Sequence, residues 1–164
     1  MFKQKLHMLL PLFLLSLLLF GCGQKPDTLA PFRGAYFAEL SGTLYGMEFA
    51  AAVEMTAASG GGTRAATVTF YAPAALAGTT VARNQAGEIN ITAGDVTLPD
   101  VGGVGAALFS LFPVSAEITE TELTEEGHTR VCGEGFVLIL LPDGTPYEIK
   151  TDAVSARVVR FAEK

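Results

Sequence analysis

Few side chains in this sequence could carry out chemistry, and the first of them is a cysteine at an unusual place. The 164-residue chain has two cysteines, two histidines and no tryptophan. Cys22 comes two residues after a run, 8–20, that is apolar throughout except for Ser16. A cysteine thiol is a nucleophile that can be modified covalently. Its position just after an apolar run calls for an explanation.

The segment before Cys22 has the layout of an export signal. Residues 1–7 are positively charged through Lys3 and Lys5, and no acidic residue precedes Cys22. The apolar run would span only about 20 Å as a helix, whereas a hydrocarbon core of about 30 Å needs roughly 20 residues. A positive start, a short apolar core and small residues are typical of a secretory signal. A signal anchor that is never removed is the alternative.

The residues around the expected cut resemble the lipobox of bacterial lipoproteins. In that family the cysteine thiol receives a diacylglyceryl group, and the signal is then removed just before the cysteine. Leu19, Gly21 and Cys22 fit the pattern, whereas Phe20 stands where a small or β-branched residue is usual. An ordinary secretory cut after Gly21 or Gly23, which would leave the thiol free, is the alternative.

The lipoprotein resemblance implies a cellular location for the chain. It divides the sequence into a signal peptide over 1–21, an acylated Cys22 with a tether over 22–34, and a single β-rich domain over 35–164. Two acyl chains hold a protein stably at a bilayer, whereas one chain holds it only marginally. The expected location is the extracytoplasmic side of the cell membrane, with N-terminal acyl chains as the anchor.

No catalytic or metal-binding constellation follows the signal. Any Ser-His-Asp arrangement would have to use His128, which lies beside an acidic turn and has the setting of an exposed histidine without a role. A zinc site built from histidine and cysteine lacks ligands. Cys132 has no partner once Cys22 is acylated, so we expect a small buried apolar side chain there. We therefore predict no cofactor, no metal and no enzymatic activity.

Charge patterns narrow the choice of partner. The formal net charge is −6, and because Lys3 and Lys5 lie in the signal, the remainder carries −8. This balance argues against a nucleic-acid partner, whose phosphates need basic patches. Gly60 to Gly62 lacks the lysine of a phosphate loop. A run of acids lacks the spacing of a calcium loop and favours a solvated strand face that protects a sheet edge: Glu117, Glu120, Glu122, Glu125 and Glu126.

From residue 35 onward, alternation of apolar and polar side chains dominates. In 47–56, for example, Phe49 and Val53 share one face while Glu48 and Glu54 lie on the other, which is typical of a half-buried strand. The same reasoning, with glycine-rich turns between the runs, predicts strands at 36–45, 47–56, 65–71, 81–83, 88–92, 95–98, 114–123, 128–141, 147–150 and 153–161.

Residues 101–112 differ, because their apolar residues recur at three and four positions, which predicts a helix. We expect Asp100 to be its N-cap and Pro113 to end it. Three glycines lower its helix propensity by about 1 kcal/mol each against alanine, so surrounding structure must hold it. The predicted fold is mainly β (α+β): a curved antiparallel sheet or half-barrel of eight to ten strands around one apolar helix.

The order of these elements resembles the lipoprotein-carrier-like (LolA/LppX-type) fold of periplasmic lipoprotein carriers and mycobacterial lipid-binding lipoproteins. The resemblance lies in the segment 71–78 after the third strand, in 87–91, and in Leu98-Pro99 before a single apolar helix. It implies a half-open sheet that encloses an apolar cavity for acyl chains. The candidate cavity residues, each of which by itself fits an ordinary core better than a cavity, are Phe49, Val53, Val68, Phe70, Ile89, Ile91, Leu108, Phe112, Leu138 and Leu140.

Two functions remain open at this point. The first is a non-catalytic, membrane-anchored lipoprotein that binds a lipid or another apolar ligand, or handles lipoproteins. The second is a structural or protein-interaction module of the cell envelope, with a filled core and an envelope protein as partner. The volume and lining of any internal cavity would separate them.

Overall fold

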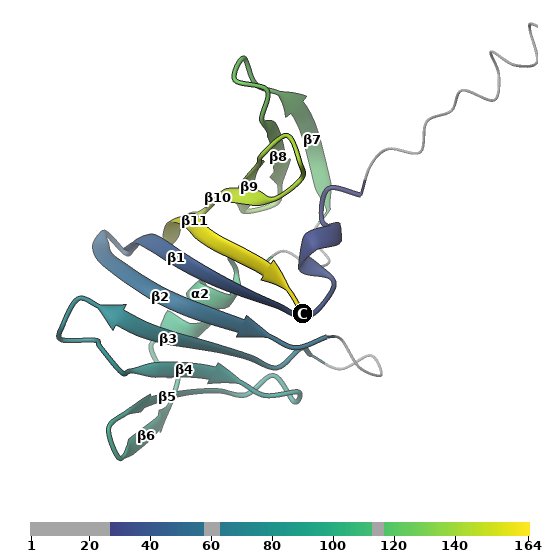
Figure 1. Ribbon diagram of the computed structural model, residues 1–164. Coiled ribbons are helices and arrows are strands. Elements are labelled where there is room, and N and C mark those ends of the chain that lie inside the picture. Colours follow the sequence, from purple (N-terminus) through teal and green to yellow (C-terminus); the bar gives the residue numbers. More distant parts are fainter. Residues whose placement is uncertain (1–26, 58–62, 113–116) are drawn as a thin grey trace, which may run out of the picture.

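The computed structural model describes residues 27–57, 63–112 and 117–164, and these build one antiparallel sheet (Figure 1). The described residues form eleven strands and one α-helix, so the predicted mainly β fold, a curved antiparallel sheet with one apolar helix, is confirmed. In chain order the elements are η1 (Ala30–Phe32), β1 (Tyr36–Leu44), β2 (Met47–Met55), β3 (Ala66–Ala72), β4 (Thr80–Arg83), β5 (Ile89–Ala93), β6 (Val96–Pro99), α2 (Val104–Phe109), β7 (Ile118–Leu123), β8 (Thr129–Gly133), β9 (Phe136–Leu140), β10 (Pro146–Thr151) and β11 (Val154–Glu163).

The sheet consists of two meanders joined at their ends. Strands β1 to β6 follow one another outward to one edge, and β7 to β11 return from the other edge to the centre. The first and last strands, β1 and β11, pair there from Tyr36 to Leu44. Within this seam Glu39 pairs with Arg160 and Leu40 with Val158, so Val159 is an extra, bulged residue.

One face of the sheet is buried and carries the core. Along β1 and β2 every second side chain points inward, as Leu40 and Val53 do, because successive side chains of a strand alternate between faces. The helix α2 covers the buried face at β4 and β5 (Figure 1). Leu108 and Leu111, in and just after α2, are fully buried against it. The apolar side chains of α2 and of the residues just after it thus cover the buried face of the first meander and form its roof.

The strand prediction fails at one place in the second meander. The run 128–141 was expected as a single strand, but the structure divides it into β8 and β9, with Glu134 and Gly135 between them. Gly135 has φ 75°, a left-handed conformation that glycine adopts without a steric penalty. Because this extra hairpin adds a strand, the sheet has eleven strands instead of eight to ten.

The helix is shorter than predicted and is capped differently. It covers six residues instead of 101–112, and its N-cap is Gly103, with φ 71°, instead of Asp100. Asp100 still acts on the helix, since its Oδ2 accepts a hydrogen bond from the backbone N–H of Ala106 at 3.1 Å. This contact satisfies one of the N-terminal amides that a helix leaves unpaired. The predicted stop at Pro113 lies outside the described residues.

Some of the other predicted features lie outside the described residues, and others lie within them. The signal over 1–21 and Cys22 lie outside the described residues. No helix in the described part of the chain is long and apolar enough to span a bilayer. The later part of the predicted tether is packed against the sheet, because Leu29 and Phe32 belong to the hydrophobic core.

Candidate ligand-binding pocket

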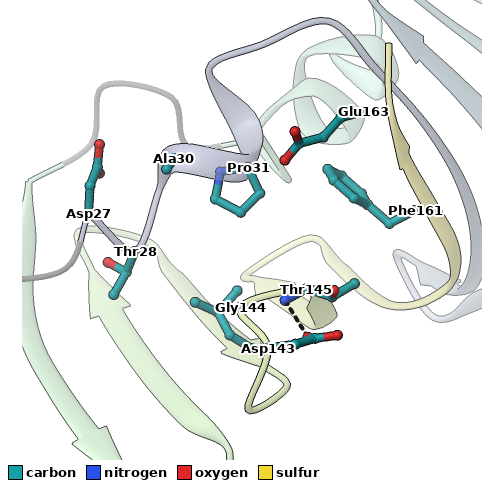
Figure 2. Close-up of a pocket in the computed structure, with 10 residues that line it drawn as sticks. Asp27, Thr28, Ala30, Pro31, Asp143, Gly144, Thr145, Phe161 and Glu163 are labelled. Carbon is teal, nitrogen blue, oxygen red and sulfur yellow. Dashed lines mark hydrogen bonds between the residues drawn. The ribbon is translucent and has the colours of Figure 1, made fainter.

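A pocket of about 320 Å³ lies where η1, the β9–β10 turn and the end of β11 meet (Figure 2). Residues from three stretches of the chain, 27–31, 140–145 and 161–163, form its wall, so only the folded sheet brings them together. Its volume is at the small end of the range for ligand sites. The residues that line it are Asp27, Thr28, Ala30, Pro31, Leu140, Asp143, Gly144, Thr145, Phe161 and Glu163.

The apolar part of the wall continues into the core. Figure 2 shows the Pro31 ring and the Phe161 ring on opposite sides of the pocket. The Phe161 ring packs on Tyr36, with centroids 5.1 Å apart, and on Phe32 at 6.1 Å. Tyr36 in turn lies 5.9 Å from the ring of Phe112, which follows α2. A chain of aromatic rings therefore connects the pocket with the roof of the first meander.

The polar part of the wall carries carboxylates. The Oδ1 of Asp143 accepts a hydrogen bond from the backbone N–H of Thr145 at 2.9 Å, which lowers the pKa of the Asp143 carboxyl. In Figure 2 the Glu163 carboxylate extends above the pocket from the end of β11. Asp27 is already neutralised, because its Oδ2 lies 3.0 Å from the guanidinium of Arg33.

A second set of polar groups lies beneath the sheet, next to Tyr36. Arg64 is buried and donates hydrogen bonds to the carbonyl oxygens of Phe32, Gly34 and, at 2.8 Å, Thr56. It thereby ties the η1 segment to the sheet. The Tyr36 hydroxyl is buried without a hydrogen-bond partner among the described residues. Burial raises the pKa of this hydroxyl and keeps it neutral.

The predicted cavity residues lie mostly in the packed core instead of the pocket. Eight are buried, namely Phe49, Val53, Val68, Phe70, Leu108, Phe112, Leu138 and Leu140, and Ile89 and Ile91 pack against them half-buried. Of the ten, Leu140 lines the pocket. Their role as a cavity therefore stays a prediction, and it would require the core to open.

Sequence reasoning did not single out the residues of this pocket. Pro31 was assigned to the tether, and Asp143 and Gly144 were interpreted only as a turn. Phe161 and Glu163 end the last strand and show no motif. The one available signal was an Asp-Gly turn with an aromatic strand end, which gives no indication that η1 lies against both.

Two side chains discussed from the sequence have different surroundings from those expected. Cys132 is partly exposed rather than buried. His128 is half-buried instead of exposed: its ring lies 5.5 Å from that of Tyr147, and its Nδ1 lies 3.7 Å from the Glu126 carboxylate. By contrast, the acidic face is confirmed as an edge, since β7 is the last strand of the sheet and all its side chains are exposed.

Comparison with known proteins supports the fold. No protein-family model and no curated protein matches the sequence. Among solved structures, an uncharacterised conserved protein from Thermus thermophilus has a TM-score of 0.53 at 17% identity, with 84% of each chain covered. A domain proposed to sort outer membrane lipoproteins, from Vibrio parahaemolyticus, has a TM-score of 0.51 at 8% identity, covering 84% of this chain and 89% of that one.

A third structure, a LolA superfamily protein from Nitrosomonas europaea, aligns with a TM-score of only 0.35 at 12% identity, over 84% of this chain and 75% of that one. The first two likenesses show that the chain shares its fold with these two proteins. At these identities the likeness concerns the fold alone, because one fold carries many functions.

Proposed function

We propose that this protein is a non-catalytic, membrane-anchored lipoprotein on the extracytoplasmic side that binds a lipid or another apolar ligand. The ligand enters at the pocket between η1, the β9–β10 turn and β11. The observation that carries the proposal is the continuity of the apolar wall at Pro31 and Phe161 with the aromatic rings of the core. An acyl chain can lie against the Pro31 and Phe161 rings, because burial of each methylene contributes about 0.8 kcal/mol.

The expected anchor supports the same site. Asp27 lines the pocket and is five residues from Cys22, so even a fully extended chain reaches only about 18 Å between them. An acylated Cys22 would therefore hold the mouth of the pocket close to the bilayer surface. A lipid could then pass between membrane and pocket over a short path.

The second candidate is an interaction module with a filled core. The dense burial of eight predicted cavity residues favours it. Under this alternative an envelope protein docks on the sheet, and the pocket is only a surface depression.

The test uses the chain from residue 22 onward with Cys22→Ser, which cannot be acylated. This change leaves the core intact, because the core is built from residues between Leu29 and Phe161. Mass spectrometry of an organic extract should show co-purified lipid. Ala30→Phe, in the exposed first position of η1, fills the pocket and should reduce the lipid at least about tenfold.

The matched control is Ala74→Phe, which places the same ring at another exposed alanine, outside the pocket lining. This control should retain the lipid. Extracts that contain no lipid from any variant would support the filled-core module instead. Equal retention of lipid in both variants would show that the ligand does not occupy this pocket.

A further inference from the structure

We infer that, when no bilayer is within reach, the pocket holds one of the protein's own acyl chains, attached at Cys22. This inference rests on the proposed function, because it assigns an occupant to the same pocket and takes Cys22 as the acylated residue. At a bilayer the acyl chain inserts into the membrane instead, and the pocket becomes free for another lipid. The anchor thus controls access to the site.

The described part of the chain begins at the pocket itself. Asp27 is the first described residue and lines the pocket, as do Thr28 and Pro31 further along (Figure 2). Cys22 is five residues before Asp27, a span of at most about 18 Å in a fully extended chain. An acyl chain is of similar length, since two of them end to end fill a hydrocarbon core of about 30 Å. An acyl chain on Cys22 can therefore reach the pocket without any change in the described structure.

Contacts with the sheet hold the wall that lies nearest to the anchor. Phe32 belongs to the hydrophobic core, and its carbonyl oxygen accepts a hydrogen bond from the guanidinium of Arg64. Asp27 is held by its ion pair with Arg33, in which the nitrogen and oxygen lie 3.0 Å apart. The distance between the anchor and the pocket therefore depends only on the short stretch 23–26.

This short connection gives the attached acyl chain an advantage over free lipid. A ligand on a short flexible linker has an effective concentration in the millimolar range, and lipids with long acyl chains dissolve in water to a far smaller extent. In water the acyl chain is stabilised when the rings of Pro31 and Phe161 cover its methylenes. A bilayer covers the whole acyl chain. The position of the acyl chain therefore depends on whether a bilayer is present.

The charges at the pocket also favour an uncharged attachment. Asp143 and Glu163 line the pocket, and in the described ranges neither forms an ion pair with a lysine or an arginine. Carboxylates repel a lipid whose head group has a net negative charge. The thioether and ester groups of a diacylglyceryl cysteine carry no charge. The attached acyl chain therefore avoids a repulsion that anionic free lipids meet.

The experiment places a single alkyl chain at a chosen cysteine. The chain from residue 22 onward with Cys132→Ser keeps Cys22 as its only thiol, and N-dodecylmaleimide attaches a twelve-carbon tail there. N-ethylmaleimide gives the reference, with the same linkage and a short tail. The matched control carries the dodecyl group on Ala74→Cys, together with Cys22→Ser and Cys132→Ser, at an exposed residue outside the pocket lining.

The first measurement is the affinity for decanol, by titration calorimetry in the absence of vesicles. We expect the Cys22 dodecyl conjugate to bind decanol at least about tenfold more weakly than the ethyl reference, because its own alkyl chain occupies the pocket. The Ala74→Cys conjugate should bind decanol as tightly as the ethyl reference does.

The second measurement is the binding of the conjugates to phosphatidylcholine vesicles, by flotation. The Cys22 dodecyl conjugate should bind vesicles more weakly than the Ala74→Cys conjugate, by about the same factor of ten, because the same occupied fraction of the pocket lowers both affinities. Ala30→Phe, which fills the pocket, should remove this difference when it is introduced into both conjugates.

The outcomes separate the two proposals. If the ethyl reference binds decanol and the Cys22 dodecyl conjugate binds it equally tightly, the self-occupied pocket is overturned while the proposed lipid site stands. If the ethyl reference does not bind decanol, the lipid site is overturned and the inference falls with it. If the Ala74→Cys conjugate loses affinity for decanol to the same extent, the dodecyl group acts without entering this pocket, which also overturns the inference.

Discussion

The two meanders of the sheet have the same strand pattern but are covered in different ways. In the first, β1 to β6, the helix α2 lies on the buried face at β4 and β5. Gly105 of α2 is itself buried against Val81 and Ile89. In the second, β7 to β11, the described cover is the three-residue η1 and its flanking residues, and beside it the pocket remains open.

This difference shows where a ligand site can arise in a uniform sheet. Alternation alone gives both meanders an apolar inner face. A helix presents enough side chains to fill the space above such a face, as close packing in protein interiors requires. A single short turn does not fill this space. The charged ends of the neighbouring strand and turn border the part that it leaves uncovered. The site thus follows from the cover and not from the strands.

The largest expected effect comes from breaking the seam that joins the two meanders. A Cβ at Gly42 would overlap the carbonyl oxygen of Ser155 and lie 2.7 Å from the Cα of Ala156. Because both are backbone atoms, β1 and β11 must separate to make room. We expect Gly42→Ala to lower the free energy of unfolding by at least about 3 kcal/mol, measured by chemical denaturation.

The control for the seam is Gly34→Ala, since a Cβ at that exposed residue meets no atom within 4 Å. It should change the free energy of unfolding by less than about 0.5 kcal/mol. A Gly42→Ala protein as stable as the control would mean that the seam is not tightly packed, and the two meanders would then be less strongly joined than the structure indicates.

A smaller and local effect should follow from lifting the helix off the first meander. A Cβ at Gly105 would overlap the Cγ2 of Ile89 and lie 2.9 Å from the Cγ1 of Val81. Overpacking of this kind costs about 1–3 kcal/mol, partly offset by the better helix propensity of alanine. Hydrogen exchange should rise in α2, β4 and β5 but not in β8 to β10.

Gly102→Ala is the matched variant for the helix, because its Cβ would be 4.0 Å from the nearest atom, in Val104. It should leave the exchange pattern unchanged. If hydrogen exchange rose equally in both meanders of the Gly105→Ala protein, this would contradict the difference between a meander that α2 covers and one that it does not cover.

The smallest effect concerns the ring that contacts both halves. Tyr36 packs on Phe112, which follows α2, and on Phe161, which lines the pocket. Its hydroxyl is buried and unpartnered among the described residues, so Tyr36→Phe removes an unmet polar group and keeps the ring. We expect the free energy of unfolding to stay the same or to rise by up to about 1 kcal/mol in chemical denaturation. A clear loss of stability would show that the hydroxyl has a partner.

Much of the fold could be predicted from local patterns. The hairpin of β1 and β2 and the strand β3 follow from glycine turns and from the alternation of apolar and polar residues. Side chains of a strand point to its two faces in turn, so a strand with one buried face shows this alternation in its sequence. The helix was found from its spacing, although its N-cap was placed at Asp100. That error arises locally, because Asp100 contacts the helix through Ala106 while the chain turns into the helix at Gly103.

The candidate site was much less accessible from the sequence. The candidate cavity residues were chosen by apolar alternation, and that pattern identifies buried side chains without telling whether the space beside them is filled. The pocket depends instead on Pro31 and Phe161, which are far apart in the chain and line one pocket only because β11 returns to pair with β1.

The sequence by itself therefore determined which residues alternate, where most turns fall and that the chain is mainly β, because these depend on neighbours within a few positions. Only the tertiary structure decided that the second half returns to the first, that β11 bulges at Val159, and that η1 leaves an acidic, partly apolar pocket uncovered. The physical reason is that close packing and the meeting of distant charges depend on the path of the whole backbone.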